Sequence, residues 1–167
     1  MPQRDSQRLF EFFILDGAQA GLSWITILKR REGYRRAFKN FDVDRVARFS
    51  NKDVERLMQD TEIIRNRLKI ESTIKNAKAF CAMRDGGDDF SQWLWDWVDG
   101  KPIDNKFKAF GKIPASTPLS ENISKELKKR GWTFVGPTIV YAVMQAAGLV
   151  NDHLVSCFRH DEVAQIG

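Results

Sequence analysis

Hydrophobic positions recur along most of the chain with the three- and four-residue spacing of an α-helix. Leu9, Phe10, Phe13 and Ile14 form one apolar face, and Asp5 or Ser6 precedes it as a start signal. The same spacing predicts further helices with apolar positions within 24–28, 43–47, 54–58, 64–81, 90–98, 123–127 and 139–144. No segment alternates as a strand does, and no repeat is visible. The pattern therefore predicts one all-α domain.

Glycine and proline divide these predicted helices. Gly17 and Gly21 are expected to interrupt the apolar pattern of the first helix, and the second is expected to end near Gly33. Residues 99–118 contain several prolines and are expected to form an irregular surface loop. Gly148 is expected to end the helix that begins near Thr138.

Net charge, cysteine number and the lengths of the apolar runs limit which classes of protein this chain can belong to. The 167 residues carry a formal net charge of +5, which fits a nucleic-acid partner without demanding one. With only two cysteines, the composition argues against a disulfide framework and favours a reducing compartment. No apolar run can span a membrane, and residues 1–5 do not resemble a signal peptide. We expect a cytoplasmic monomer with no membrane or protein partner.

Residues 128–138 join a basic helix end to a new helix. Lys128 and Lys129 come just before Gly131, which can adopt the left-handed conformation that ends helices. Gly136 and Thr138 flank a proline suited to the first position of the next helix, whose leading amides form an anion site. The interpretation is a phosphate site, and the alternative is an ordinary helix–turn–helix connection.

Residues 15–24 combine a carboxylate, two glycines and a tryptophan. Asp16 lies at the C-terminal end of an apolar helix, where the helix dipole disfavours negative charge. Glycines near position 21 would let the backbone approach a ligand, and Trp24 offers a ring for stacking. This combination suits a flat cationic group. The alternative is a capped turn with Trp24 in the core, which residue type alone favours.

Two further groups carry weaker signals. His153 and Cys157 are four residues apart, so a helical turn would place two zinc ligands on one face; a surface histidine and a buried thiol are the simpler alternative. Trp93 and Trp97 share a helical face that suits base stacking or, more simply, hydrophobic docking.

Several blocks, in this order, resemble bacterial 3-methyladenine DNA glycosylase I. They cover nearly the whole chain, and their co-occurrence is specific although each block alone is weak. The blocks are Gln19-Ala20-Gly21-Leu22-Ser23-Trp24, Asp53-Val54-Glu55-Arg56-Leu57, Ile63-Ile64-Arg65-Asn66-Arg67, Leu127-Lys128-Lys129-Arg130-Gly131, Phe134-Val135-Gly136-Pro137-Thr138 and Gly148-Leu149-Val150-Asn151-Asp152-His153.

The resemblance implies a single helix-hairpin-helix DNA glycosylase domain over residues 1–167, with the hairpin at about 118–148. It implies base-excision repair of alkylated double-stranded DNA by hydrolysis of the N-glycosidic bond of 3-methyladenine. By the same resemblance, Asp16 acts as the catalytic, base-binding carboxylate and Trp24 stacks on the base. Gly21 and Leu22 fill the gap left by the extruded nucleotide. Lys128, Lys129, Gly136 and Thr138 hold phosphates, and His153 and Cys157 match half of a structural zinc site.

Two departures from the family pattern stand out. The family has Glu where this chain has Asp16, so the carboxylate is drawn back by one methylene. The family also begins with a segment that carries a Cys, a His and pocket aromatics. Met1-Pro2 already aligns inside the family pattern, so one hypothesis is a start assigned late, at a GUG codon.

The alternatives are a truncated DNA-binding remnant that releases no base and a protein-interaction module built on the Trp-rich helix. Asp152, next to His153, is expected to have a structural role as a cap or hydrogen-bond partner.

Overall fold

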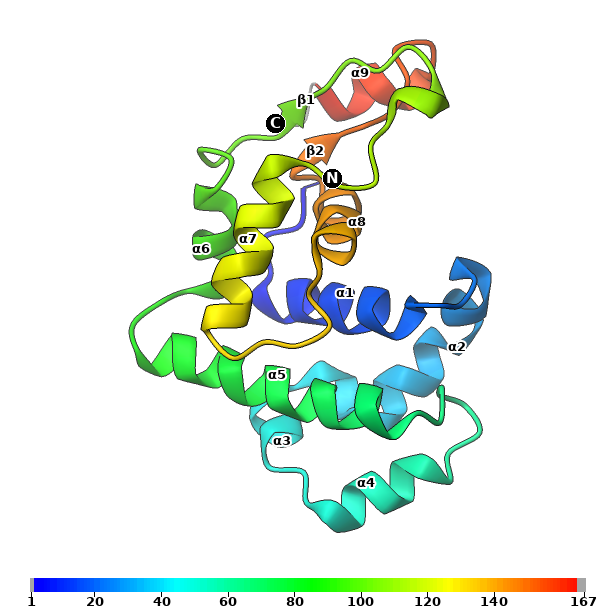
Figure 1. Ribbon diagram of the computed structural model, residues 1–167, viewed down its shortest axis with the longest axis vertical. Helices are drawn as coiled ribbons and strands as arrows, with labels where there is room; N and C mark the ends of the chain where they lie inside the picture. The colour runs from blue at the N-terminus through cyan, green and yellow to red at the C-terminus, as the bar shows by residue number, and fades with distance from the viewer. Residues whose placement is uncertain (1, 165–167) are drawn as a thin grey trace.

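The computed structural model describes residues 2–164, and helices make up most of that part of the chain (Figure 1). The elements follow in the order α1 (Ser6–Gln19), α2 (Trp24–Ala37), the 3-10 turn η1 (Lys39–Phe41), α3 (Val43–Ala47), α4 (Asn51–Met58), α5 (Arg67–Asp85), α6 (Phe90–Asp96), β1 (Ile103–Asp104), the 3-10 turn η2 (Phe110–Lys112), α7 (Pro118–Lys129), α8 (Pro137–Ala147), β2 (Val150–Asn151) and α9 (Phe158–Ala164). The all-α fold class is confirmed. No helix among residues 2–164 is both long enough and apolar enough to cross a bilayer.

Capping residues place most helix starts where the sequence predicts them. The Asp5 side chain accepts from the amide of Arg8 at the start of α1, and the Asp42 side chain accepts from the amide of Arg45 at the start of α3. Ser50 and Asp53 form a reciprocal capping box at the start of α4. Each such cap satisfies an amide that has no partner inside its helix and stabilises the helix by about 1 kcal/mol.

Three details of the helix pattern differ from the expectation. Gly17 does not interrupt α1 but lies buried inside it, because a helix accepts glycine where a neighbouring segment packs closely. Gly33 does not end α2, which continues to Ala37; a Cβ at Gly33 would lie 2.6 Å from Glu62, so the glycine is there for close packing. Leu68, one of the apolar positions within 64–81 that the helical spacing places on the inner face, is 69% exposed at the start of α5 and does not belong to the core.

A short parallel sheet, with two residues in each of its two strands, lies at one end of the molecule. Ile103 pairs with Val150 and Asp104 with Asn151, which joins the irregular segment after α6 to the end of α8. Two residues per strand are too few to produce a visible alternation, so the sequence pattern predicted no strand here. The pairing holds the irregular segment against the rest of the fold, at the top of Figure 1.

Aromatic side chains fix helix α1 in the centre of the domain. Phe10 meets Phe80 and Trp132 edge to face, at ring-centroid distances of 5.8 and 6.0 Å. Phe13 meets Phe90 at 5.8 Å, and Phe90 stacks on Trp132 at 5.1 Å. Each pair adds about 0.5–1.5 kcal/mol beyond the area that it buries. The rings come from α1, α5, α6 and the α7–α8 turn, so they tie those four segments together.

A buried ion cluster sets α2 against α1. Glu11 is 3% exposed, and its carboxylate accepts from Arg31 Nε and Arg35 Nε on α2, both at 2.9 Å, and from Arg8 on α1 at 2.9 Å. Burial alone raises the pKa of Glu11, but the hydrogen bonds from these guanidinium groups outweigh it and leave that pKa below its ordinary value. The cluster orients the helix that carries Trp24 relative to the helix that carries Asp16.

Candidate active site

The corner between α1 and α2 carries four of the predicted site residues. α1 ends at Gln19, and α2 begins at Trp24 after Ser23, whose hydroxyl caps the helix through the amide of Thr26. Gly21 lies at the tip with φ +79°, which is the left-handed region that favours glycine. Leu22 is 39% exposed beside it. The turn therefore presents an apolar side chain to solvent on a tight, glycine-dependent bend.

Asp16 is a buried carboxylate with an oxygen that has no partner. Its exposure is 7%, and its Oδ2 atom is fully buried without a hydrogen-bond donor. Burial raises the pKa of Asp16 from 3.8 to about 7. An unpaired buried acceptor is costly unless something donates to it, so Asp16 is arranged to receive a donor or a cation from outside the domain.

Trp24 is 42% exposed at the first position of α2, so the expectation from residue type, burial in the core, is wrong. It lines a hollow of about 140 Å³ together with Phe12, Leu15, Ile27, Leu28, Arg31 and Ala146. Asp16 follows directly after Leu15 on α1 but is not part of this lining. The hollow is smaller than typical ligand pockets of about 300 Å³ or more.

The α7–α8 turn forms the second predicted group. Gly131 has φ +90° and ends α7, Gly136 caps α8, and the first helical bond of α8 runs from Val140 N to Gly136 O. The amides of Thr138 and Ile139 therefore have no carbonyl acceptor within α8 and lie at its positive dipole end. The local geometry is that of an anion-binding helix start.

The cations around this turn are not equally available. Lys128 and Lys129 are exposed at the C-terminal end of α7, and Lys129 forms an ion pair with Glu126 at 2.5 Å within α7. Arg130 pairs with Asp88 at 2.6 Å and lies over the ring of Trp93. Arg130 is thus engaged away from the turn, and Lys128 is exposed and forms no ion pair among the residues that the structure describes.

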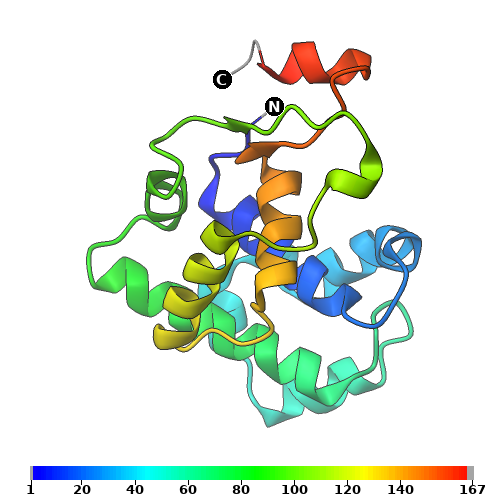
Figure 2. The same ribbon diagram turned by 45° about the horizontal axis from the view of Figure 1, so that its top comes forward.

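The structure brings the C-terminal part of α1 into contact with the α7–α8 turn. A Cβ at Gly17 would lie 3.4 Å from both the Cβ and the carbonyl oxygen of Phe134, which itself has φ +53°. Figure 2 shows α8 (orange) crossing α1 (blue), with the α7–α8 turn at the lower end of α8, in front of α5 (green). Asp16 and Gly21 on one segment and Gly136 and Thr138 on the other thus belong to neighbouring parts of the molecule, although more than 100 residues separate them.

His153 and Cys157 lie at the opposite end of α8, after β2. They are not on a helix, so the helical spacing expected for them is wrong. His160 bonds to Asp104 and Asp161 at 3.0 Å each. Among residues 2–164, no three or more His, Cys, Asp or Glu side chains gather in a way that could hold a metal ion. Two ligands do not fit a complete structural zinc site.

Asp152 has the structural role expected of it. Its carboxylate accepts from the Asn105 amide at 2.7 Å, from the Gln145 amide at 2.8 Å and from the Tyr141 hydroxyl. Burial, followed by this hydrogen bond to Asp152, raises the pKa of Tyr141. Asp152 therefore joins α8 to the segment after β1.

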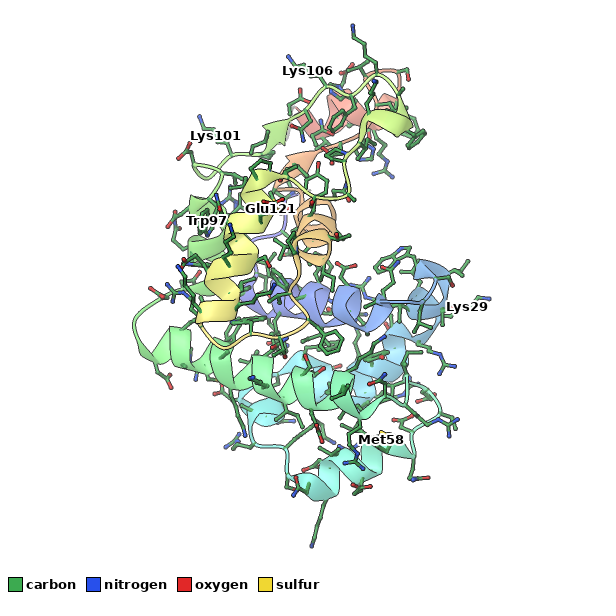
Figure 3. All side chains as sticks on the ribbon, in the orientation of Figure 1. Lys29, Met58, Trp97, Lys101, Lys106 and Glu121 are labelled. Carbon is green, nitrogen blue, oxygen red and sulfur yellow. The ribbon has the colours of Figure 1, made fainter. Side chains whose placement is uncertain are left out.

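The Trp-rich helix α6 packs against the α7–α8 turn through Phe90 and Trp132, and its Trp97 end lies away from the α1–α2 corner. Trp95 is buried, whereas Trp93 and Trp97 are half-buried and meet edge to face at 6.1 Å. Figure 3 shows Trp97 at the α6 edge of the molecule and Lys29 at the opposite edge, on α2 beyond the α1–α2 corner. The packing fits hydrophobic docking of α6 better than base stacking.

Two residues on α5 hold these turns, and neither was predicted from the sequence as part of the site. Lys69 bonds to the end of α1, and Asn76 bonds to the α7–α8 turn. One signal was available for Lys69: a lysine in the first turn of a helix is unfavourable for the helix dipole and indicates another partner. Nothing in the local sequence of Asn76 indicates its partner.

A buried, protonatable carboxylate at the end of α1 and an amide-rich, basic start of α8 suit a charged group attached to phosphate, and the exposed ring of Trp24 lies toward the other end of α8, near Ala146.

The family model for methyladenine glycosylase matches residues 1–160, and the chain belongs to that family. DNA-3-methyladenine glycosylase 1 of Escherichia coli (strain K12) is 50% identical over 157 residues, which cover 94% of this chain and 84% of the relative. A crystal structure of 3-methyladenine DNA glycosylase I matches with a TM-score of 0.92 and 52% identity, over 95% of this chain and 87% of the other. A crystal structure of a variant of 3-methyladenine DNA glycosylase I in complex with 3-methyladenine matches with a TM-score of 0.91 and 35% identity, over 95% and 85%.

Proposed function

We propose that this chain is a base-excision repair glycosylase that hydrolyses the N-glycosidic bond of 3-methyladenine in alkylated DNA. Membership of the methyladenine glycosylase family supports the reaction, and the related structure that holds 3-methyladenine supports the base. The observation that carries the proposal is the buried Asp16 oxygen without a donor, which a cationic base with amino hydrogens would satisfy. The remnant alternative is set aside, because the chain covers 84% of the Escherichia coli relative.

The leaving group explains why one carboxylate suffices. Methylation at N3 gives the base a positive charge and weakens its glycosidic bond, so strong acid catalysis is unnecessary. The protein has to flip the nucleotide, stack the base and admit water to the sugar carbon. Ionised Asp16 binds the cationic base and stabilises the positive charge that develops on the sugar as the bond breaks.

The two turns bind different parts of the DNA: the α1–α2 turn contacts the flipped nucleotide and its gap, and the α7–α8 turn contacts the phosphates. Leu22, at the tip of the α1–α2 turn, is the apolar wedge that fills the space left by the flipped nucleotide, and Gly21 supplies the bend that aims it. Trp24 stacks on the flipped base. Lys128, Lys129 and the amides near Gly136 and Thr138 hold phosphates, in the manner of a helix-hairpin-helix motif, without reading sequence.

The pH dependence of excision tests this function. Because burial raises the pKa of Asp16 to about 7, the carboxylate is largely protonated below pH 6 and ionised above pH 8. We expect the excision rate at subsaturating enzyme to rise about tenfold per pH unit below 7 and to level off above it. With saturating enzyme the bound cationic base lowers the pKa of Asp16, so the midpoint moves to lower pH.

The measurement is the single-turnover release of 3-methyladenine from methylated duplex DNA between pH 5.5 and 8.5. An Asp44→Asn variant is the matched control, because Asp44 is exposed on α3 and pairs with Arg84. This control should reproduce the wild-type profile. Absence of released base at every pH would contradict the proposed function, and a rate that falls as the pH rises would contradict the role of Asp16.

Zinc is expected to bind this chain only weakly. We propose that His153 and Cys157 contribute two ligands of a structural zinc site, and structural sites normally take four. After dialysis against micromolar zinc, the 167-residue chain should retain well under one equivalent, and a Cys157→Ser variant should retain less. Stoichiometric zinc that survives dialysis would show that other groups complete the site.

A further inference from the structure

Helix α5 contacts both turns that we assign to DNA. At its N-terminal end, the Lys69 ammonium donates to the carbonyl oxygens of Ala18 and Ala20, both at 2.8 Å. Two turns later, the Asn76 side chain donates to Thr133 O at 2.9 Å and accepts from Thr133 N at 2.8 Å. Figure 1 shows α5 running beneath α1 and the α7–α8 turn. One rigid helix therefore bonds to the backbone of both turns.

Lys69 is an unfavourable residue for its own helix. It is the third residue of α5, within a turn capped by Asn66, where the amides and the helix dipole favour negative charge. Its partners lie at the C-terminal end of α1, where the dipole favours a cation and where carbonyl oxygens lack partners within the helix. Half-burial lowers the pKa of Lys69, as expected for an ammonium held against backbone rather than in water.

The two carbonyls held by Lys69 lie between the residues that act on the substrate. Ala18 is two positions after Asp16, and Ala20 directly precedes Gly21 and Leu22. The segment has few bonds of its own: Ala20 N donates to Gly17 O at 3.3 Å, and Leu22 N donates to Gln19 O at 2.6 Å. Leu22 and Trp24 are exposed, so packing does not fix the tip. Among the side-chain hydrogen bonds of residues 2–164, those of the Lys69 ammonium join residues 18–22 to the rest of the domain.

We propose that Lys69 is a positioning residue for base excision, which holds residues 18–22 so that Leu22 enters the duplex while Asp16 meets the flipped base. This role rests on the proposed glycosylase function. Binding of undamaged DNA depends mainly on phosphate contacts at the α7–α8 turn, so loss of the Lys69 contacts affects excision more than binding. Arginine at position 69 also carries donors and a positive charge, and it keeps at least one of the two carbonyl bonds.

The test compares Lys69→Met, Lys69→Arg and Lys75→Met with wild type. Lys75 is exposed on the same helix, so Lys75→Met is the matched loss of a lysine. For Lys69→Met we expect single-turnover excision with saturating enzyme to fall at least tenfold, while the Kd for undamaged duplex changes less than threefold. Lys69→Arg should recover at least a third of the wild-type rate, and Lys75→Met should match wild type.

Amide hydrogen exchange gives a second readout that does not depend on activity. In Lys69→Met, the amides of Ala20 and Leu22 should exchange at least tenfold faster, with no change in α8. Unchanged exchange, unchanged excision, or a Lys69→Arg variant as slow as Lys69→Met would each overturn the proposal. If wild type releases no base, the proposed function fails, and the exchange experiment still decides whether Lys69 holds the turn.

Discussion

Replacing Asp16 with Asn is expected to slow the release of 3-methyladenine by about 100- to 1,000-fold, the usual cost of removing one preorganised charge-stabilising group. Asn keeps the shape of the side chain but cannot offer a negative charge to the cationic base. The measurement is the single-turnover excision rate at pH 8, where the wild-type carboxylate is ionised because burial places its pKa at about 7. The Kd for undamaged DNA should stay within about threefold, because Asp16 does not contact phosphate in this account.

The same substitution should raise stability at alkaline pH. The pKa of Asp16 is higher in the folded state, about 7, than the ordinary value of 3.8, so the wild-type protein loses stability as the pH rises between these values. The full difference corresponds to about 4 kcal/mol at about 1.4 kcal/mol per pH unit. The gain in Asp16→Asn should be smaller, about 1–3 kcal/mol at pH 8, because the amide is also unpaired. A variant that unfolds more easily at pH 8 would contradict this assignment.

Asp16→Glu is the matched control for charge. It restores the residue of the family pattern and moves the carboxylate outward by one methylene. We expect it to excise 3-methyladenine within about tenfold of wild type, in contrast to Asp16→Asn. If Asp16→Glu were as slow as Asp16→Asn, the negative charge would not be what the reaction needs.

Replacing Trp24 with Ala is expected to lower excision by about 5- to 150-fold, which corresponds to the 1–3 kcal/mol that base–aromatic stacking contributes. Because Trp24 is 42% exposed, its loss should lower the free energy of unfolding by about 1–2 kcal/mol, less than the roughly 3–5 kcal/mol lost with a fully buried Trp. Binding to undamaged duplex should change less than threefold, since an unflipped base does not reach the ring. Single-turnover excision and fluorescence-anisotropy binding on one preparation separate these effects.

Two further substitutions sharpen the test of Trp24. Trp24→Phe keeps an aromatic face and should retain more activity than Trp24→Ala. Trp97→Ala removes a half-buried tryptophan at the other edge of the molecule, which Figure 3 shows far from Lys29 on α2, and should leave excision unchanged. Equal losses of excision and binding in Trp24→Ala would indicate a structural role for the ring.

The helix starts and ends around the site could be predicted from residues close by in the sequence. Capping side chains act within three or four residues, so the starts of α1, α3 and α4 were readable from Asp5, Asp42 and Ser50. The end of α7 and the start of α8 were readable for the same reason, because Gly131 and Pro137 act through their own backbone geometry.

Properties that depend on distant partners could not be predicted in this way. Gly17 lies inside α1 because Phe134 packs on it, and Gly33 lies inside α2 because Glu62 packs on it. The pKa of Asp16 depends on burial by the whole domain, and Lys69 finds its acceptors about 50 residues earlier in the chain. The exposure of Trp24 also follows from its place at the corner, whereas residue type alone favours the core.

The most direct test of the account is the amount of free 3-methyladenine that the 167-residue chain releases from methylated duplex DNA, with Asp16→Asn assayed beside it. We expect at least one base released per wild-type molecule within minutes at pH 8, and at least 100-fold slower release by Asp16→Asn. Wild-type protein that retains the duplex but releases no base would contradict excision by this chain, and equal release by both proteins would contradict the role of Asp16.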